Sequence, residues 1–406
     1  LLIFYKHVPS VTNFPVYLGA LDELLEPFMD DVDEATAKKL IRLFLIHVDR
    51  TVLDSFSHAN IGPKATRAGR LILEAEAELE QAVPNLTLKY QEGVTPDDFA
   101  LEAVNTALHS AKPSFANHAM FKSELGENYV IASCYNGLLL GGGSYTLCRL
   151  MLGTIARKSK NLADFKERML PHVMDVMAKY MDARIKFEVE ESGFFENHFL
   201  AKEGFIHRDR FTAMFGLVGL AECVNTLLEK EGIPGRYGHD KNADDLGVEI
   251  MEQIRAFNES HVNPYCEATG GHFLLHGQVG IAQDHGVTPG TRIPIGEEPD
   301  ELIDELLHCS RFHKYFPSGM GDIIPIDVTV HQNPAYVLDI VKGSFRKDLR
   351  YLSFFSSDSD VIRVTGYLVK KSEMAKLDAG QNVLQDTTQL GLGASKNGKI
   401  LERRVR

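Results

Sequence analysis

A glycine interrupts a run of strand-forming residues near the end of the chain. Residues 361–371 read VIRVTGYLVKK, so Gly366 stands among valine, isoleucine, threonine, tyrosine and leucine. A glycine inside a strand costs about 0.5–1 kcal/mol relative to alanine, and it usually marks a bulge, a turn or a close approach. Steric freedom is one explanation for this residue. The other is chemical, because the α-carbon of glycine is the one in a protein that readily holds an unpaired electron.

A second candidate for chemistry is a thiol in the middle of the chain. In IASCYNGLLLGGGSYTLCRL, residues 131–150, a strand-like run ends at Cys134 and a glycine-rich loop follows. We expect a helix to begin near Ser144, where free N–H groups could hold an anionic group. A thiol at a strand end is well placed to react in a central cavity. A buried cysteine beside a tight turn is the alternative interpretation.

The two stretches together resemble the glycyl radical enzymes of the pyruvate formate-lyase-like superfamily. Arg363, Val364, Gly366 and Tyr367 match the Arg-Val-x-Gly-Tyr signature of that family, and GGGSYTL resembles the segment after its cysteine loop. The stretches SFSHANIGP, KPSFANHAMF, FTAMFGLVGLAE, RIPIGEEP and SDSDVIRVTGYLVK extend the likeness over most of the chain. They resemble the YjjI-type branch of the family.

The resemblance implies an α/β fold, a ten-stranded α/β barrel of two five-stranded half-barrels ringed by helices. Residues 1–406 would form a single domain, with residues 350–406 as its C-terminal glycine radical region. Cys134 and Gly366 would lie on loops that meet at the centre of the barrel. The first residue is Leu rather than Met, so we expect an N-terminal part of the protein to be missing.

The resemblance also implies a mechanism in which Gly366 and Cys134 are the catalytic residues. A radical stored on Gly366 would take hydrogen from the Cys134 thiol, and the thiyl radical would attack the substrate. Arg363 and Tyr367 would support the radical loop. The chain has no three-cysteine cluster motif, so S-adenosylmethionine and the iron–sulfur cluster that such chemistry needs would belong to a separate activating enzyme. We expect no bound cofactor or metal in this protein.

Positions at which this sequence differs from the characterised subfamilies narrow the set of reactions that it could catalyse. Ser133 precedes Cys134, where pyruvate formate-lyases have adjacent cysteines, so thioester transfer to coenzyme A is disfavoured. Asn136 stands where diol lyases, choline-type lyases and decarboxylases place a glutamate base, and an amide cannot take a proton. The C-terminal four-cysteine zinc site of the anaerobic ribonucleotide reductases has no counterpart. A radical lyase or isomerase of a small polar substrate remains.

Further polar residues could line the substrate pocket. His118, in FANHAMF, is a candidate base because histidine titrates near neutral pH, although a histidine on an apolar stretch is more often a core residue. Asn117 and Asn136 are further candidates. Arg292 is another, in TRIPIGEEPDEL with Glu297 and Glu298.

Other clusters have more ordinary explanations. His308, Cys309 and His313 could hold a metal, yet their neighbours are typical of an amphipathic helix, and packing is favoured. His272 and His276 alternate as in a strand and lack the glutamate of a zinc helix. A different class stays open: a non-radical α/β protein that binds a small ligand, or a thiol- or metal-dependent hydrolase, which needs a histidine beside its nucleophile.

Composition excludes several partners. The net charge of −13 argues against a nucleic-acid or acidic-membrane surface, and we interpret the basic end KNGKILERRVR as a solvated tail. The five cysteines are scattered, odd in number and without a C-x-x-C pair, which fits a reducing cytoplasm. We expect a homodimer whose partners are the activating enzyme and a small-molecule substrate.

Long helical patterns alternate with short apolar strands, and these elements must position the chemistry. We expect a helix after Asp33 with Leu40, Leu43, Phe44 and Val48 on its buried face. A second helix opens with a capping box from Thr95 to Asp98. Residues 211–232 read as one buried helix that ends at Gly232. Strands are predicted within residues 127–134, 271–281 and 349–357.

Overall fold

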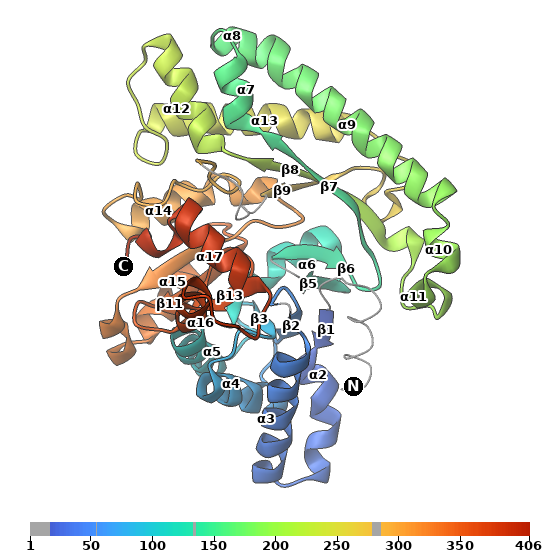
Figure 1. Ribbon diagram of the computed structural model, residues 1–406, viewed down its shortest axis with the longest axis vertical. Helices are drawn as coiled ribbons and strands as arrows, with labels where there is room; N and C mark the ends of the chain where they lie inside the picture. Colours follow the sequence, from blue (N-terminus) through green and yellow to red (C-terminus); the bar gives the residue numbers. More distant parts are fainter. Residues whose placement is uncertain (1–16, 54, 133–134, 278–285) are drawn as a thin grey trace.

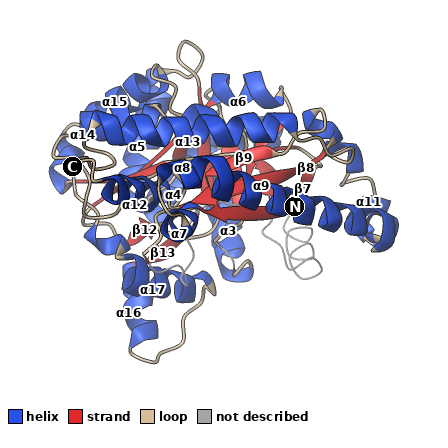
Figure 2. Cartoon of the chain, turned by 90° about the horizontal axis from the view of Figure 1, so that it is seen from above, coloured by secondary structure: helices blue, strands red, loops and turns tan. Residues whose placement is uncertain are grey.

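The computed structural model describes residues 17–53, 55–132, 135–277 and 286–406. Strands occupy the interior and helices surround them (Figure 1, Figure 2). The α/β class predicted from the sequence is confirmed. In the part of the chain that the structure describes, no helix has the length and apolar character needed to cross a membrane.

The larger sheet of the described residues has six strands in the order β1-β2-β3-β4-β11-β10. Neighbouring strands run parallel except for β4 and β11, which are antiparallel. The strands are β1 (Tyr17–Ala20), β2 (His58–Ile61), β3 (Asn85–Tyr90), β4 (Ser114–Asn117), β10 (Asp322–Ile326) and β11 (Tyr351–Ser356). The five strands from β2 onward in this order are buried except at Lys89, as expected for a sheet covered on both faces, whereas the edge strand β1 is mostly half-buried.

A second, parallel sheet joins β7 (Gly143–Met151), β8 (Phe211–Val218) and β9 (Leu274–Gly277). Gly277 at the end of β9 donates to the carbonyl of Gly319, just ahead of β10, at 3.0 Å. The antiparallel contact between β4 and β11 therefore separates two groups among the described strands. Strands β1–β4 form one group, and the five strands β7–β11 form the other.

Two antiparallel hairpins lie apart from these sheets in the described chain. One consists of β5 (Tyr129–Ala132) and β6 (Asn136–Leu139), and the other of β12 (Val361–Arg363) and β13 (Leu368–Lys370). They carry the stretches that the sequence singles out for chemistry.

Helices on the side of β1–β4 cover the lower part of Figure 1, and those on the side of β7–β9 cover the upper part. The α-helices are α2 (Leu21–Leu25), α3 (Glu34–Thr51), α4 (Arg67–Leu79), α5 (Asp97–Ser110), α6 (His118–Leu125), α7 (Leu152–Lys158), α8 (Leu162–Asp164), α9 (Leu170–Lys186), α10 (Phe194–Asn197), α11 (Phe199–Lys202), α12 (Leu220–Glu231), α13 (Lys241–Ser260), α14 (Leu302–Ser310), α15 (Ala335–Phe345), α16 (Lys371–Asp378) and α17 (Thr387–Gly398). Shorter turns are η1 (Glu26–Asp31), η2 (Phe165–Met169), η3 (Phe187–Glu191), η4 (Arg208–Arg210), η5 (Glu267–Thr269), η6 (His313–Tyr315), η7 (Val328–Gln332) and η8 (Ile400–Glu402).

Two predicted helices are strands over part of their length. Residues 211–232 are not one helix: strand β8 comes first, Gly219 turns the chain with φ +77°, and α12 follows up to the predicted stop at Gly232. Every residue of β8 is buried, and an apolar run buried on both faces does not reveal its period. The helix expected near Ser144 is wrong as well, because β7 begins at Gly143. It pairs with β8 along its length.

Details of two predicted helices also differ. Phe44 and Val48 of α3 are buried as predicted, but Leu40 and Leu43 are about half exposed, at 53% and 52%. The buried face of α3 is rotated toward Ile41 and Leu45. The capping box at Thr95 does not form: Pro96 is the N-cap of α5, and the Thr95 hydroxyl accepts from the backbone N–H of Gln91 at 3.0 Å.

Candidate active site

Gly366 lies in the turn that joins β12 to β13. Arg363 pairs with Leu368 at the last rung of the hairpin, and the N–H of Val364 donates to the carbonyl of Tyr367 at 3.0 Å. The strand-like pattern of residues 361–369 is therefore two short strands and a turn, all of it buried. The expectation that the glycine marks a turn is confirmed.

A buried asparagine from another strand holds the glycine. The side-chain amide of Asn85, at the start of β3, donates to the carbonyl of Gly366 at 2.8 Å. Arg363 donates from Nη2 to Oδ1 of the same asparagine at 2.8 Å, and the side chain of Arg363 is fully buried. Arg363 thus orients Asn85, and Asn85 fixes the peptide plane after Gly366.

The C-terminal tail closes over the same turn, so the prediction of a solvated tail is wrong. Arg403 donates to the carbonyls of Arg363 and Val364 at 3.0 and 2.6 Å. Three residues later, the backbone N–H of Arg406 donates to the carbonyl of Pro325, and the carbonyl of Arg406 accepts from the N–H of Asp327. The buried guanidinium of Arg406 pairs with Glu305. A guanidinium carries five donors, and Arg403 directs two of its nitrogens to carbonyls beside the turn.

Tyr367 and Phe56 connect the glycine hairpin to the hairpin of β5 and β6. The ring centroids of Tyr367 and Phe56 are 4.8 Å apart. Phe56 also packs against a small buried cluster that contains Ile131, Tyr135 and Tyr351. Residues near each hairpin tip therefore share one aromatic neighbour.

The cysteine stretch belongs to the hairpin of β5 and β6, where Ala132 pairs with Asn136. Ser133 and Cys134 lie outside the described residues, and so does the predicted meeting of Cys134 with Gly366. The flanking strands are firmly held. Asn60 of β2 exchanges hydrogen bonds of 2.9 and 3.0 Å with the backbone of Ile131, and the N–H of Gly137 donates to Ser318 at 2.6 Å.

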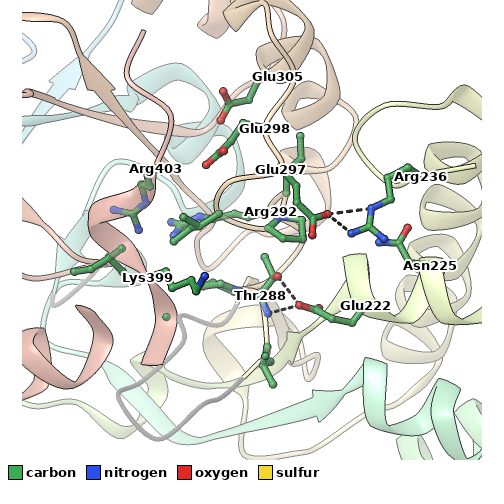
Figure 3. Close-up of a pocket in the computed structure, with 18 of the residues that line it drawn as sticks. Glu222, Asn225, Arg236, Thr288, Arg292, Glu297, Glu298, Glu305, Lys399 and Arg403 are labelled. Atoms are coloured by element: carbon green, nitrogen blue, oxygen red, sulfur yellow. Dashed lines mark hydrogen bonds and ion pairs between the residues drawn. The ribbon is translucent and has the colours of Figure 1, made fainter. Parts of the chain in front are cut away.

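A cavity of about 760 Å³ opens beside the glycine turn (Figure 3). Thr365, the residue before Gly366, lines it, and so does Arg292. Arg292 donates from Nη2 to the hydroxyl of Tyr135, the residue after Cys134, at 3.1 Å, and from Nε to the carbonyl of Gly321 at 2.7 Å. The cavity thus reaches the neighbour of Gly366 directly, and one of its lining residues, Arg292, binds the neighbour of Cys134.

Charged residues from several elements line the rest of the cavity. They include Glu222 of α12, Arg236, Glu297 and Glu298 from loops, Glu305 of α14, Asp322 of β10, and Lys399 and Arg403 after α17, and the uncharged Asn225, Thr288 and Cys309 lie among them. Figure 3 shows Glu297 paired with Arg236 and Glu222 bonded to Thr288 on one side, with Arg403 and Lys399 on the other. Arg292 extends toward the latter pair.

The remaining predicted pocket residues lie elsewhere than in this cavity. Asn117 is the N-cap of α6 and donates to the carbonyls of Phe345 and Leu349 at 3.2 and 3.1 Å. His118 is hydrogen-bonded through Nδ1 to the hydroxyl of Tyr129 at 2.8 Å. Burial, together with nearby lysines, lowers the pKa of His118 to about 4. Asn136 lies at the start of β6 with a buried Oδ1 that no described residue hydrogen-bonds.

Cys309, His313 and Asp322 lie together, with potential ligand atoms within 4.8 Å of one another. The backbone N–H of Arg350 donates to Nδ1 of His313 at 2.9 Å, so the proton of a neutral ring sits on Nε2, which bonds Asp322 at 2.6 Å. Neither nitrogen then has a lone pair for a metal. Burial favours the protonated form of Asp322, but His313 and Arg292 outweigh it and bring its pKa down to about 2.

The same cluster does not form a thiol hydrolase. Asp322, not His313, stands next to the Cys309 thiol, and burial together with the Asp322 charge raises the pKa of that thiol. A hydrolytic thiol needs a base that lowers its pKa. His308, the third residue of the predicted cluster, bonds Asp244 at 3.0 Å. Packing and ion pairing, as favoured from the sequence, describe these residues.

Sequence reasoning missed Asn85, Thr365 and Arg403. Asn85 follows Pro84 at the start of a strand with no motif around it, and only the fold brings it to Gly366. Thr365 was inside the signature but lacked an assigned role. Arg403 carried a signal, since it belongs to a basic run, but charge alone does not separate a tail in water from one that binds carbonyls.

Comparison with known proteins agrees with these features. A family model described as glycyl radical enzyme YjjI-like matches residues 1–406. The chain is 47% identical over 409 residues to an uncharacterized protein from Haemophilus influenzae, a match that covers 100% of this chain and 79% of that protein. It is 43% identical over 407 residues to the uncharacterized protein YjjI from Escherichia coli, with coverage of 100% and 78%.

Among solved structures, a glycyl radical enzyme from Archaeoglobus fulgidus superposes with a TM-score of 0.74 at 13% identity. The match covers 97% of this chain, which spans 65% of the length of that solved chain, slightly under two thirds. At this identity the likeness shows the fold. It confirms the predicted α/β barrel.

Proposed function

The chain belongs to the YjjI-like family of glycyl radical enzymes, and from this premise we propose that it stores an unpaired electron on Gly366 and uses the thiol of Cys134 for a lyase or isomerase reaction on a small polar substrate. The observation that carries the proposal is the buried turn of Gly366, whose carbonyl is held by Asn85 at 2.8 Å. A surface turn would need neither the burial nor the tether.

The turn suits a carbon radical for a physical reason. A radical on the α-carbon is stabilised by delocalisation into both flanking amides, which requires a nearly planar carbon. A Cβ would crowd that planar state. Asn85 restricts rotation of the peptide that follows Gly366, and Arg403 holds the segment that leads to it through the carbonyls of Arg363 and Val364. We assign Arg363 a supporting role because it orients Asn85.

The proposed cycle moves hydrogen atoms one at a time between named groups. The Gly366 radical takes the hydrogen atom of the Cys134 thiol, which restores the glycine and leaves a thiyl radical. The thiyl radical takes a hydrogen atom from a C–H bond of the substrate. After the substrate radical rearranges or fragments, the product radical takes the hydrogen back from Cys134, and Gly366 returns its own to the sulfur.

We further propose that a separate activating enzyme removes the first hydrogen atom from Gly366, and that it carries the S-adenosylmethionine and iron–sulfur cluster. We assign residues 350–406 as the glycine radical region of one domain over residues 1–406. This region supplies β11 to the larger sheet, the hairpin of Gly366, helices α16 and α17, and the tail that holds the turn.

Electron paramagnetic resonance tests the proposal directly. Protein treated anaerobically with its activating enzyme should give an organic radical signal, and Gly366→Ala should fold normally but give none. Gly343→Ala is the matched control, because a Cβ at this position of α15 meets no atom within 4 Å, and it should keep the full signal. A radical signal of undiminished size in Gly366→Ala would overturn the assignment.

A further inference from the structure

The cavity beside Gly366 has cationic groups gathered on the side of the glycine turn. Arg292 comes from the loop before α14, and Lys399 and Arg403 come from the segment after α17. Figure 3 shows Arg292 extending toward the other two. Lys399 is at the rim, with 66% of its side chain exposed, whereas Arg292 is only 8% exposed.

The guanidinium of Arg292 has donors to spare. Its Nε and Nη2 are used by the carbonyl of Gly321 and the hydroxyl of Tyr135. No described residue accepts a hydrogen bond from Nη1, and Arg292 lines the cavity. Nη1 is not one of the enclosed polar atoms, so this donor pair is accessible to an acceptor inside the cavity.

Arg403 adds a second cationic charge, and no carboxylate of the described residues forms an ion pair with it. It donates to the neutral carbonyls of Arg363 and Val364. Burial, followed by the charge of Arg292, lowers the pKa of Arg403. Two guanidinium groups held near each other in a partly buried position repel, and an anion between them would relieve the repulsion.

Carboxylates around the cavity, one of which pairs with Arg292, limit the charge of that anion. Asp322 lies 3.5 Å from Arg292 and bonds His313, Glu305 pairs with Arg406, and Glu298 accepts from the N–H of Gly296 at 2.8 Å. These acids balance part of the cationic charge, which disfavours a dianion such as a phosphate ester. They also accept hydrogen bonds, and Oε2 of Glu222 is buried with no described partner.

We propose that this cavity binds a small monocarboxylate that carries hydroxyl or ammonium donors. Its carboxylate is held by Arg292 and Arg403 beside the Gly366 turn, and its donors face the acidic walls. Guanidinium and carboxylate match in shape and charge. The identification of this ligand class with the substrate rests on the proposed function, whereas the binding itself does not.

Binding of three probes to the unactivated protein, measured by isothermal titration calorimetry, tests the site without any radical. Glycerate has a carboxylate and hydroxyl groups, glycerol lacks the charge, and glycerol 3-phosphate carries a dianion. We expect glycerate to bind more tightly than both. Arg403→Gln and Arg292→Lys should each weaken glycerate binding roughly 10- to 100-fold, as for loss of a hydrogen bond between charged groups.

Arg404→Gln is the matched control, since it removes the same charge from the adjacent residue, which pairs with Asp300 instead. It should leave glycerate binding unchanged. Circular dichroism shows whether each variant is folded. If Arg403→Gln does not fold, the binding measured with Arg292→Lys decides the test. Absence of glycerate binding to the wild type, equal binding of glycerol, tighter binding of glycerol 3-phosphate, or equal loss in Arg404→Gln would each overturn the proposal. Because no radical is involved, these results are independent of whether Gly366 can be activated.

Discussion

The two hairpins that carry the signature stretches are alike in form and differ in how they are held. Each is tethered by a buried asparagine from a neighbouring strand of the first sheet group: Asn60 of β2 for the cysteine hairpin and Asn85 of β3 for the glycine hairpin. Asn60 binds the backbone of Ile131, within strand β5. Asn85 binds the carbonyl of Gly366 itself.

This difference follows from what each hairpin is proposed to do. The glycine must keep a planar, delocalised α-carbon for as long as the radical is stored, so its own peptide is fixed. Arg403 extends that restraint to the carbonyls of Arg363 and Val364. The thiol works by passing a hydrogen atom back and forth, and the described tethers of its hairpin set the position of the strands.

The largest expected effect is cleavage of the main chain by oxygen at Gly366 and at no other residue of its hairpin. A carbon radical adds dioxygen, and the resulting peroxyl group leads to cleavage of the main chain at that residue. Activated protein exposed to air should therefore release the segment that follows Gly366, which ends at Arg406, whereas unactivated protein stays whole. Denaturing electrophoresis and mass spectrometry measure the fragment.

Proteolysis of a turn could produce a similar fragment, so Gly366→Ala is carried through activation and air as the control. Cutting of this variant at the same place would identify a protease-sensitive turn and contradict the radical assignment. The burial of residues 361–369 argues against such sensitivity.

The next effect tests whether the cysteine hairpin exchanges hydrogen with the glycine hairpin. The α-hydrogen of a glycyl radical splits its resonance into a doublet. A thiol exchanges its hydrogen with solvent, so reversible transfer between Cys134 and Gly366 in D₂O should place deuterium on the α-carbon and collapse the doublet. Cys134→Ser should keep both the signal and its splitting, because a hydroxyl hydrogen is too strongly bound to be taken.

Cys148→Ser is the matched control for this experiment. Cys148 is half-buried on β7, a free thiol apart from both hairpins, and its replacement should leave the collapse intact. Persistence of the doublet in activated wild-type protein in D₂O would show that Cys134 and Gly366 do not exchange hydrogen, and the two-hairpin mechanism would fail.

A smaller effect compares the two asparagine tethers. Asn85→Ala leaves the buried carbonyl of Gly366 and a donor of Arg363 without this partner, and we expect a loss of about 1–3 kcal/mol in the free energy of unfolding. Asn60→Ala should cost a similar amount. Only Asn85→Ala should shorten the lifetime of the radical under anaerobic conditions, because only that tether fixes the radical-bearing peptide.

Urea unfolding measures the stability of both variants, and the decay of the resonance signal measures the lifetime. Asn242→Ala serves as the surface control, since this exposed side chain bonds the carbonyl of Pro234, and it should change neither quantity appreciably. Equal radical lifetimes in Asn85→Ala and Asn60→Ala would contradict the distinction drawn between the hairpins.

The sequence predicted the family of this molecule better than its secondary structure elements. The signature around Gly366 identified the family because it reflects a chemical requirement that few residues satisfy. The run FTAMFGLV gave no such help: a segment buried on both faces is apolar at every position, whether strand or helix, and tertiary pairing made it β8. Leu40 and Leu43 fit the apolar face of a helix, yet the position of the sheet relative to the helix decides which part of that face is buried.

The site shows the same division. Arg292, which the sequence predicts to line a substrate pocket, lines the cavity beside the Gly366 turn; an arginine between apolar residues and a glutamate pair is unusual enough to notice. His118 and Asn117 lie in a conspicuous motif, yet their partners Tyr129, Phe345 and Leu349 are visible only in the fold. Arg403 was predicted to be solvent-exposed, because a sequence shows which residues are charged but not which carbonyl groups lie within reach of them.

The smallest expected effect concerns pH and the cysteine hairpin. His118 supports that hairpin through the hydroxyl of Tyr129 on β5, and burial lowers its pKa from 6.5 to about 4. At a pH between these two values, His118 is protonated in the unfolded chain and neutral in the folded chain. The free energy of unfolding should therefore rise with pH across this window, and the contribution of His118 should be fully present above pH 6.5. One pKa unit corresponds to about 1.4 kcal/mol; because the next residue, Ala119, is exposed, solvent relaxation should reduce the total to about 1–2 kcal/mol. In His118→Gln, which can still bond Tyr129, the difference in stability between pH 7 and about pH 4, measured by urea unfolding, should shrink by that amount. The radical signal of this variant should stay at its wild-type size, since the glycine hairpin is held by Asn85 and Arg403. An unchanged pH dependence in His118→Gln would show that the histidine takes up its proton in the folded protein, and a weakened radical signal would show that the two hairpins are not held independently.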